Sequence, residues 1–139
     1  MEIFNIEKEE KDIKQASPLV WAYIGDAVFE LFVRTELINI KNAKPNKLHL
    51  ESIKIVSAKA QKEILEKIYE CLTEEEKEIV RKGRNVKPKT MSKNASVSEY
   101  IYATGFEALI GYLYLNKEDE RLEEIFEIIK KEVILKKEK

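Results

Sequence analysis

The sequence predicts an all-α protein, and three observations support that prediction. Only four glycines and three prolines occur in 139 residues, which leaves few turn signals for a strand-rich fold. Apolar residues recur at three- and four-residue spacing over long stretches, as on one face of a helix. Two S/T-x-x-E patterns, beginning at Thr73 and Ser96, are typical of helix starts. We therefore expect a single domain, residues 1–139, built as a compact bundle of about five main helices.

The first expected helix covers residues 18–37, with Ser17 as its N-cap and Pro18 at its first position. Its apolar residues fall on nearly every face instead of forming a single stripe. A helix that is apolar all round is buried on most sides. In so small a domain, we expect a second protein chain to cover one of those faces.

Four further helices follow, each with apolar residues at helical spacing or with a capping box at its start. They are expected over residues 46–72, 73–83, 96–116 and 118–139. Residues 83–95 show no such periodicity, and we expect a loop there.

Composition excludes several classes of protein. The single cysteine, Cys71, rules out an internal disulfide and leaves too few thiols for a zinc cluster. No stretch has the pattern of a signal peptide or the length of a membrane span, so a soluble cytoplasmic protein is expected. Lysine plus arginine (25) nearly balance aspartate plus glutamate (26), and this total gives no sign of nucleic-acid binding. The charges are unevenly placed, however, and the total is then a poor guide.

Three carboxylates interrupt helices that are otherwise mostly apolar: Asp26 and Glu30 in the first helix, and Glu107 in the fourth. Gly25 and Gly105 lie close to these acids, and a helix glycine permits close approach of another backbone. We therefore expect the two helices to meet tightly with their carboxylates converging. Converging carboxylates repel each other unless a hard cation such as Mg²⁺ or Mn²⁺ lies between them. The alternative is that each acid is salt-bridged where two helices pack.

The segment 81–94 concentrates positive charge and contains no acid. Its candidate nucleic-acid-binding residues are Arg81, Lys82, Arg84, Asn85, Lys87, Lys89 and Lys93. Lysine and arginine suit contacts to phosphates, whereas the absence of an aromatic residue argues against base stacking. A duplex backbone is therefore the expected ligand, and a merely solvated loop is the alternative.

His49, the only histidine, is left out of the expected catalytic site.

Five segments together resemble the ribonuclease III catalytic domain, and within that family they look most like the short Mini-ribonuclease III subfamily. They are AYIGDAVFE (22–30), KPNKLH (44–49), IVSAKAQ (55–61), RKGRNVK (81–87) and FEALIGYLYL (106–115). The resemblance covers roughly residues 16–130, and no double-stranded RNA-binding domain is expected. It implies a homodimer in which the first helices pack across the two-fold axis and a valley receives duplex RNA.

By this resemblance, Asp26 and Glu107 are the catalytic residues and hold Mg²⁺, for which Mn²⁺ can substitute. Typical ribonuclease III enzymes carry two further acids, at places where this chain has Ala22 and Thr104. We therefore expect one directly held ion per site, with waters and an RNA phosphate completing its coordination. Glu30 is expected to assist without binding the ion directly.

The activity that the resemblance implies is a magnesium-dependent endoribonuclease that cleaves double-stranded RNA. Its products would carry 5′-phosphate and 3′-hydroxyl ends, and its substrate would be a stem in the precursor of 23S ribosomal RNA. Two alternatives stay open. One is a non-catalytic duplex-RNA-binding or ribosome-assembly factor on the same fold, and the other is a helical interaction module with no role in RNA.

Overall fold

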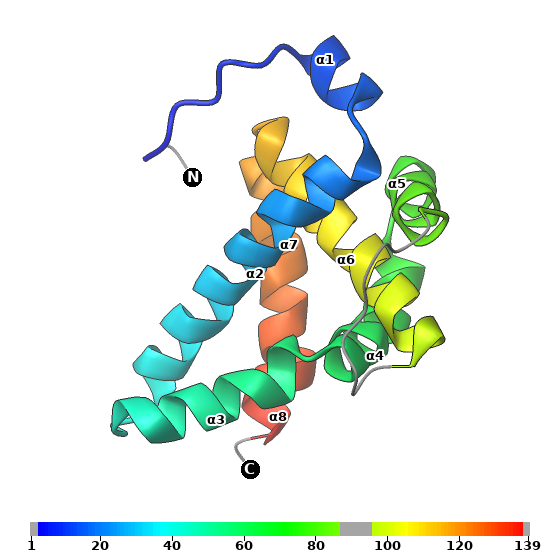
Figure 1. Cartoon of the computed structure of the whole chain (residues 1–139). Helices are drawn as coiled ribbons and strands as arrows, with labels where there is room; N and C mark the ends of the chain where they lie inside the picture. The colour runs from blue at the N-terminus through cyan, green and yellow to red at the C-terminus, as the bar shows by residue number, and fades with distance from the viewer. Residues whose placement is uncertain (1–2, 87–95, 138–139) are drawn as a thin grey trace.

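The computed structural model describes residues 3–86 and 96–137, and all regular structure in these residues is helical, as predicted (Figure 1). The helices in chain order are α1 (Glu10–Gln15), α2 (Pro18–Ile40), α3 (Pro45–Val56), α4 (Ala58–Ile68), the 3₁₀ turn η1 (Tyr69–Cys71), α5 (Glu74–Arg84), α6 (Val97–Leu115), α7 (Asp119–Ile129), the π-helical segment η2 (Lys130–Ile134) and α8 (Leu135–Lys137). None of the described helices is both long enough and apolar enough to span a membrane.

Helix α6 runs through the middle of the molecule, with α2, α4, α5 and α7 packed around it (Figure 1). Its residues Phe106, Leu109 and Ile110 have no exposed surface. The ring of Phe106 meets that of Phe29 in α2 edge to face, with centroids 4.9 Å apart. Burying each side chain of this size stabilises the fold by roughly 1.5–3 kcal/mol. The two helices predicted to be largely apolar are therefore the ones around which the core forms.

Hydrogen bonds confirm three predicted helix starts. The hydroxyl of Ser17 accepts a bond from the backbone N–H of Leu19 at 3.2 Å. Thr73 and Ser96 each form a complete capping box with the glutamate three residues further on. Asn116 closes α6, as predicted, by donating its backbone N–H to a carbonyl of the last turn. These signals are local, which is why the sequence alone locates them.

The predicted single helix over residues 46–72 is wrong, because Ser57 interrupts it. Ser57 has extended backbone angles (φ −62°, ψ 157°), and its hydroxyl accepts a bond from the N–H of Ala60 at 3.2 Å. A serine that caps locally gives the backbone an alternative to continuous helix. The bend ends α3, begins α4 and lays α4 against α6.

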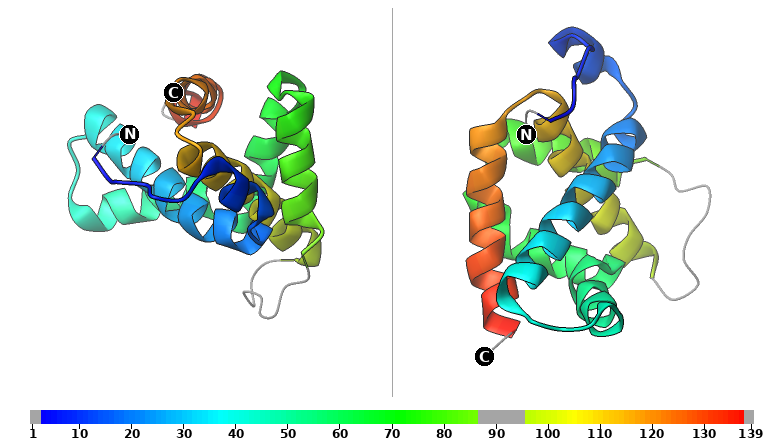
Figure 2. Two further views of the ribbon diagram at one scale, coloured as in Figure 1. Left: turned by 90° about the horizontal axis from the view of Figure 1, so that it is seen from above. Right: turned by 90° about the vertical axis from the view of Figure 1, so that its left-hand side faces the viewer.

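The right-hand view in Figure 2 shows α7, η2 and α8 as one continuous rod beside α2. Lys117, with a left-handed φ of 59°, separates this rod from α6. The rings of Phe32 and Phe126 stack in parallel, 4.2 Å apart, and join the rod to α2. The predicted C-terminal helix is therefore present, but it contains a π-helical segment and does not stay α-helical throughout.

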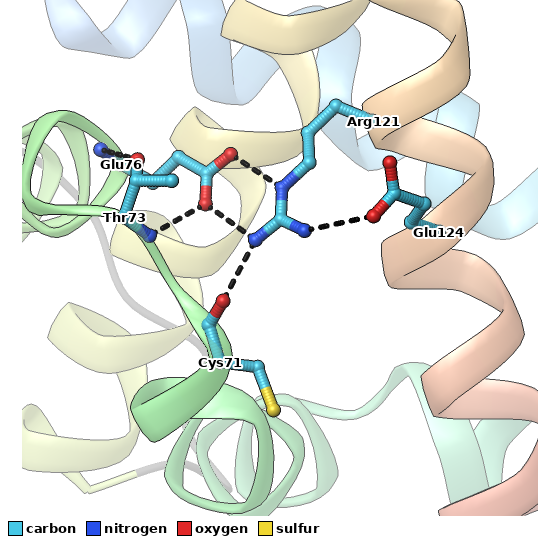
Figure 3. Close-up of polar contacts among 5 residues, drawn as sticks. All are labelled: Cys71, Thr73, Glu76, Arg121 and Glu124. Atoms are coloured by element: carbon cyan, nitrogen blue, oxygen red, sulfur yellow. Dashed lines mark hydrogen bonds and ion pairs between the residues drawn. The ribbon is translucent and has the colours of Figure 1, made fainter.

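Arg121 of α7 anchors the start of α5 (Figure 3). Its guanidinium donates to both carboxylate oxygens of Glu76 and to the carbonyl of Cys71, each at 2.8 Å. Burial disfavours the charged form of Glu76, but the bonds from Arg121 and from the N–H of Thr73 outweigh it and lower the pKa of Glu76. The network therefore holds α5 firmly in place beside α6.

Candidate active site

Two glycines allow α2 and α6 to touch backbone to backbone. A Cβ atom built on Gly25 would lie 1.8 Å from the carbonyl oxygen of Glu107. A Cβ atom on Gly111 would lie 1.7 Å from the carbonyl oxygen of Trp21. Both distances are far shorter than any real carbon–oxygen contact, so only glycine fits either position. Because Asp26 follows Gly25 directly, this contact brings its side chain next to Glu107.

The sequence-based prediction that Gly105 contacts the first long helix, α2, is wrong. Gly105 faces α5 and not α2, because its Cβ would lie 2.9 Å from the carbonyl oxygen of Val80 and 2.8 Å from Cγ of Arg84. Gly83 of α5 lies at the same contact, since a Cβ on Gly83 would lie 2.9 Å from Cα of Gly105. This second tight contact of α6 therefore holds α5, the helix that carries Arg81, Lys82 and Arg84, close against α6.

Asp26 and Glu107 line one surface pocket, and Asp26 lies close enough to raise the pKa of Glu107. Asp26 is exposed, contrary to the expectation of an acid buried inside an apolar helix, whereas Glu107 is half-buried. Burial and the neighbouring charge of Asp26 raise the pKa of Glu107 to about 8. Without a cation, the carboxyl pair therefore holds a proton in most molecules at neutral pH.

Gln61 of α4, which the sequence reading missed, is the third member of this group. Its side-chain amide donates to Oε2 of Glu107 at 3.2 Å and to the carbonyl of Val56 at 2.9 Å. Both neighbours are acceptors, so the NH₂ group must face them, which leaves the Oε1 atom buried without a partner. One signal was available: Gln61 is a polar residue on the apolar stripe formed with Ile64 and Ile68.

Glu30 lies on the rim of the same site. It lines a surface pocket together with Asp26 and Glu107. Its carboxylate pairs with Arg34 at 3.3 Å, one helical turn away, and does not join the carboxyl pair. Glu30 is therefore salt-bridged, but within α2 and not where two helices pack, as the alternative had it. His49 lines a different pocket, between α2 and α3.

The donors at this site suit a small hard cation. Two neighbouring carboxyl groups repel each other when both are ionised, and a divalent ion removes that repulsion. Among the described residues, no group of three or more histidine, cysteine, aspartate or glutamate side chains is arranged so that it could hold a metal ion. Protein carboxylates could therefore fill only part of the coordination shell, and water and phosphate oxygens would have to fill the rest.

The predicted basic loop proves to be largely helical where the structure describes it. Arg81, Lys82 and Arg84 occupy the last turns of α5, and Asn85 is its C-cap. Arg81 pairs with Glu78 one turn earlier, so part of its charge is neutralised. The other three predicted residues, Lys87, Lys89 and Lys93, lie outside the described residues.

The fold is that of a ribonuclease III domain, and residues 19–118 match the sequence model of that family. A Mini-ribonuclease 3 of Clostridium tetani is 51% identical over 120 residues, which cover 86% of this chain and 80% of the relative. One from a Thermoanaerobacter species is 53% identical over 112 residues, 81% of this chain and 79% of the relative. A crystal structure of a Fusobacterium nucleatum protein has a TM-score of 0.77 at 36% identity, covering 86% of this chain and 96% of that one.

The chain therefore belongs to the Mini-ribonuclease 3 branch of the ribonuclease III family, and it is an endoribonuclease.

Proposed function

We propose that the protein is a magnesium-dependent endoribonuclease that cleaves double-stranded RNA, the substrate on which its family acts. The observation that supports this most directly is the convergence of Asp26 and Glu107 at the α2–α6 contact. When bound, a divalent ion lowers the pKa of a water and stabilises the charge that develops on the phosphate. Asp26 and Glu107 would hold that ion, and the bond from the Gln61 amide would keep the Glu107 carboxylate in place for it.

The experiment that tests this function uses a labelled RNA duplex with magnesium, with and without a chelator. We expect cleavage only with free metal, with a 5′-phosphate and a 3′-hydroxyl at each cut. Metal-independent binding without any cleavage would instead support the non-catalytic binding or assembly factor.

We propose a stem of precursor 23S ribosomal RNA as the substrate, and the cytoplasm as the location. A precursor stem that is cut no faster than an unrelated duplex would contradict that substrate.

We further propose that the protein works as a homodimer through α2. Val20, Tyr23, Leu31 and Ile38 are 50%, 82%, 49% and 63% exposed and share one face of that helix. Exposed apolar faces of this kind are characteristic of protein interfaces. The protomer mass is 16.3 kDa, so a dimer is readily distinguished from a monomer by sedimentation equilibrium.

Replacing Leu31 by glutamate is expected to convert the dimer into monomers, because it places a charge in the centre of the apolar face. Sedimentation equilibrium measures the change. Leu50 is 60% exposed but lies on α3, so Leu50→Glu serves as the matched control and should leave the mass unaltered. A Leu31→Glu variant that stays dimeric would exclude this face as the interface.

Metal affinity is expected to rise about tenfold per pH unit up to about pH 8 and then to level off. The pKa of Glu107 is raised to about 8, so below that pH the carboxyl pair must release a proton before it can hold the ion with both groups. Above that pH no proton is released. Calorimetric titration of the RNA-free protein with Mn²⁺ at several pH values measures both the affinity and the proton count. A flat affinity between pH 6 and pH 8 would show that ion binding does not displace a proton from Glu107.

Replacing Gln61 by leucine is expected to weaken Mn²⁺ binding about tenfold, as is typical when a residue that orients a metal ligand is lost. Leucine fills similar space but cannot donate to Glu107 Oε2 or to the carbonyl of Val56. Duplex binding in the presence of a chelator should not change, because Gln61 is only 2% exposed. Unaltered Mn²⁺ affinity in a folded variant would limit Gln61 to a structural role.

A further inference from the structure

Two cations lie over the ring of Tyr102 near the start of α6. The guanidinium carbon of Arg84 is 4.5 Å from the ring centroid, and Nζ of Lys62 is 5.1 Å from it. Lys62 also donates to the hydroxyl of Ser98 at 2.9 Å. The three elements α4, α5 and α6 thus each contribute to one compact group, which we call the Tyr102 site: Lys62, Arg84, Ser98 and Tyr102.

Neither cation of the Tyr102 site has a carboxylate partner among residues 3–86 and 96–137. Arg81 lies one turn before Arg84 and differs from it, because Arg81 has a carboxylate partner in Glu78. The Nε–H group of Arg84 is buried and makes no hydrogen bond to any residue that the structure describes. A cation–π contact stabilises each charge by about 0.5–2 kcal/mol, but it does not neutralise it. The site therefore keeps two positive charges close together, which is unfavourable until an anion binds.

The Tyr102 site is built on α4, α5 and α6, and α4 and α6 also carry Gln61 and Glu107. The stem of Arg84 packs against Gly105, where a Cβ would lie 2.8 Å from its Cγ atom. Lys62 directly follows Gln61, which binds Glu107. Tyr102 precedes Glu107 by five residues on α6, which corresponds to about 7.5 Å along a helix axis.

We propose that the Tyr102 site binds a backbone phosphate of the duplex RNA and so places the strand for cleavage at the carboxyl pair. This inference rests on the proposed function. A guanidinium and an ammonium held on a ring face keep N–H groups available for phosphate oxygens, and a phosphate would supply the missing counter-charge. Contacts to phosphate carry no sequence information, so the site contributes affinity and register and not base preference.

The test measures duplex affinity in a chelator by fluorescence anisotropy, with KCl varied from about 50 to 200 mM. Lys62→Gln and Arg84→Gln should each weaken binding to two unrelated duplex sequences equally. Each should also reduce the slope of log K against log salt by about one. Lys136 pairs with Glu132 at 2.8 Å on the C-terminal rod, so Lys136→Gln is the matched control and should leave the slope unchanged.

Arg84→Lys keeps the charge and should keep the salt slope, and its melting temperature shows whether the position tolerates substitution. If the wild-type protein binds duplex RNA while Lys62→Gln and Arg84→Gln both keep the full slope, the Tyr102 site is overturned and the proposed function stands. If the wild-type protein does not bind duplex RNA at all, both proposals are overturned.

Discussion

Replacing Asp26 by asparagine is expected to lower the rate of duplex cleavage about a thousandfold, which corresponds to about 4 kcal/mol of lost transition-state stabilisation. Asparagine preserves the shape of the side chain but removes the negative charge that holds the ion. Glu107 alone would then have to bind the metal, and its Gln61 contact would remain intact. Single-turnover cleavage of a labelled duplex in magnesium measures the effect.

Glu30→Gln is the matched control for Asp26→Asn, because Glu30 lines the same pocket and lies one turn away on α2. Its carboxylate pairs with Arg34, so we expect a loss of about tenfold or less. Duplex binding in a chelator should stay close to wild type for both variants, which separates chemistry from recognition. Undiminished cutting by Asp26→Asn would remove Asp26 from the mechanism.

A second comparison tests whether the two carboxylates act as one unit. Glu107→Gln alone should cost about as much as Asp26→Asn, and the double variant should cost little more than either. Losses that add in free energy would mean that the two groups act on separate steps.

The sequence was sufficient to predict the all-α class and the ends of α5 and α6, because caps such as Thr73, Ser96 and Asn116 act within one helical turn. The break at Ser57 was not predicted, although serine is a common N-cap. Apolar spacing continues across Ser57, so periodicity alone favoured one helix. The hydrogen bond from the N–H of Ala60 to the Ser57 hydroxyl favours a new helix start at Ser57. Apolar periodicity does not show whether this bond forms in place of a continuous helix.

The site was harder to predict than the helices. The residues Asp26 and Glu107 stood out as charges in apolar helices, but their convergence depends on Gly25 meeting the backbone of Glu107. Nothing in the local sequence states which helix a glycine contacts, and the expected partner of Gly105 was wrong for that reason. Gln61 was missed because the orientation of α4 follows from the bend at Ser57, which sequence periodicity concealed.

Replacing Gly25 by alanine is expected to destabilise the protein by about 4 kcal/mol or more, a large part of the 5–15 kcal/mol typical of a folded domain. The added Cβ would lie 1.8 Å from the carbonyl oxygen of Glu107, and backbone atoms of a central helix cannot move aside cheaply. Urea unfolding followed by circular dichroism measures the free energy of unfolding.

The sign of the Gly25→Ala effect makes this a stringent test of the α2–α6 contact. In an uncrowded helix, alanine is favoured over glycine by about 1 kcal/mol, so the variant would be more stable than wild type if the two backbones were apart. Gly111→Ala breaks the same contact from the other side, where its Cβ would lie 1.7 Å from the carbonyl of Trp21. Because one separation of the helices relieves both clashes, the double variant should cost less than the sum of the two.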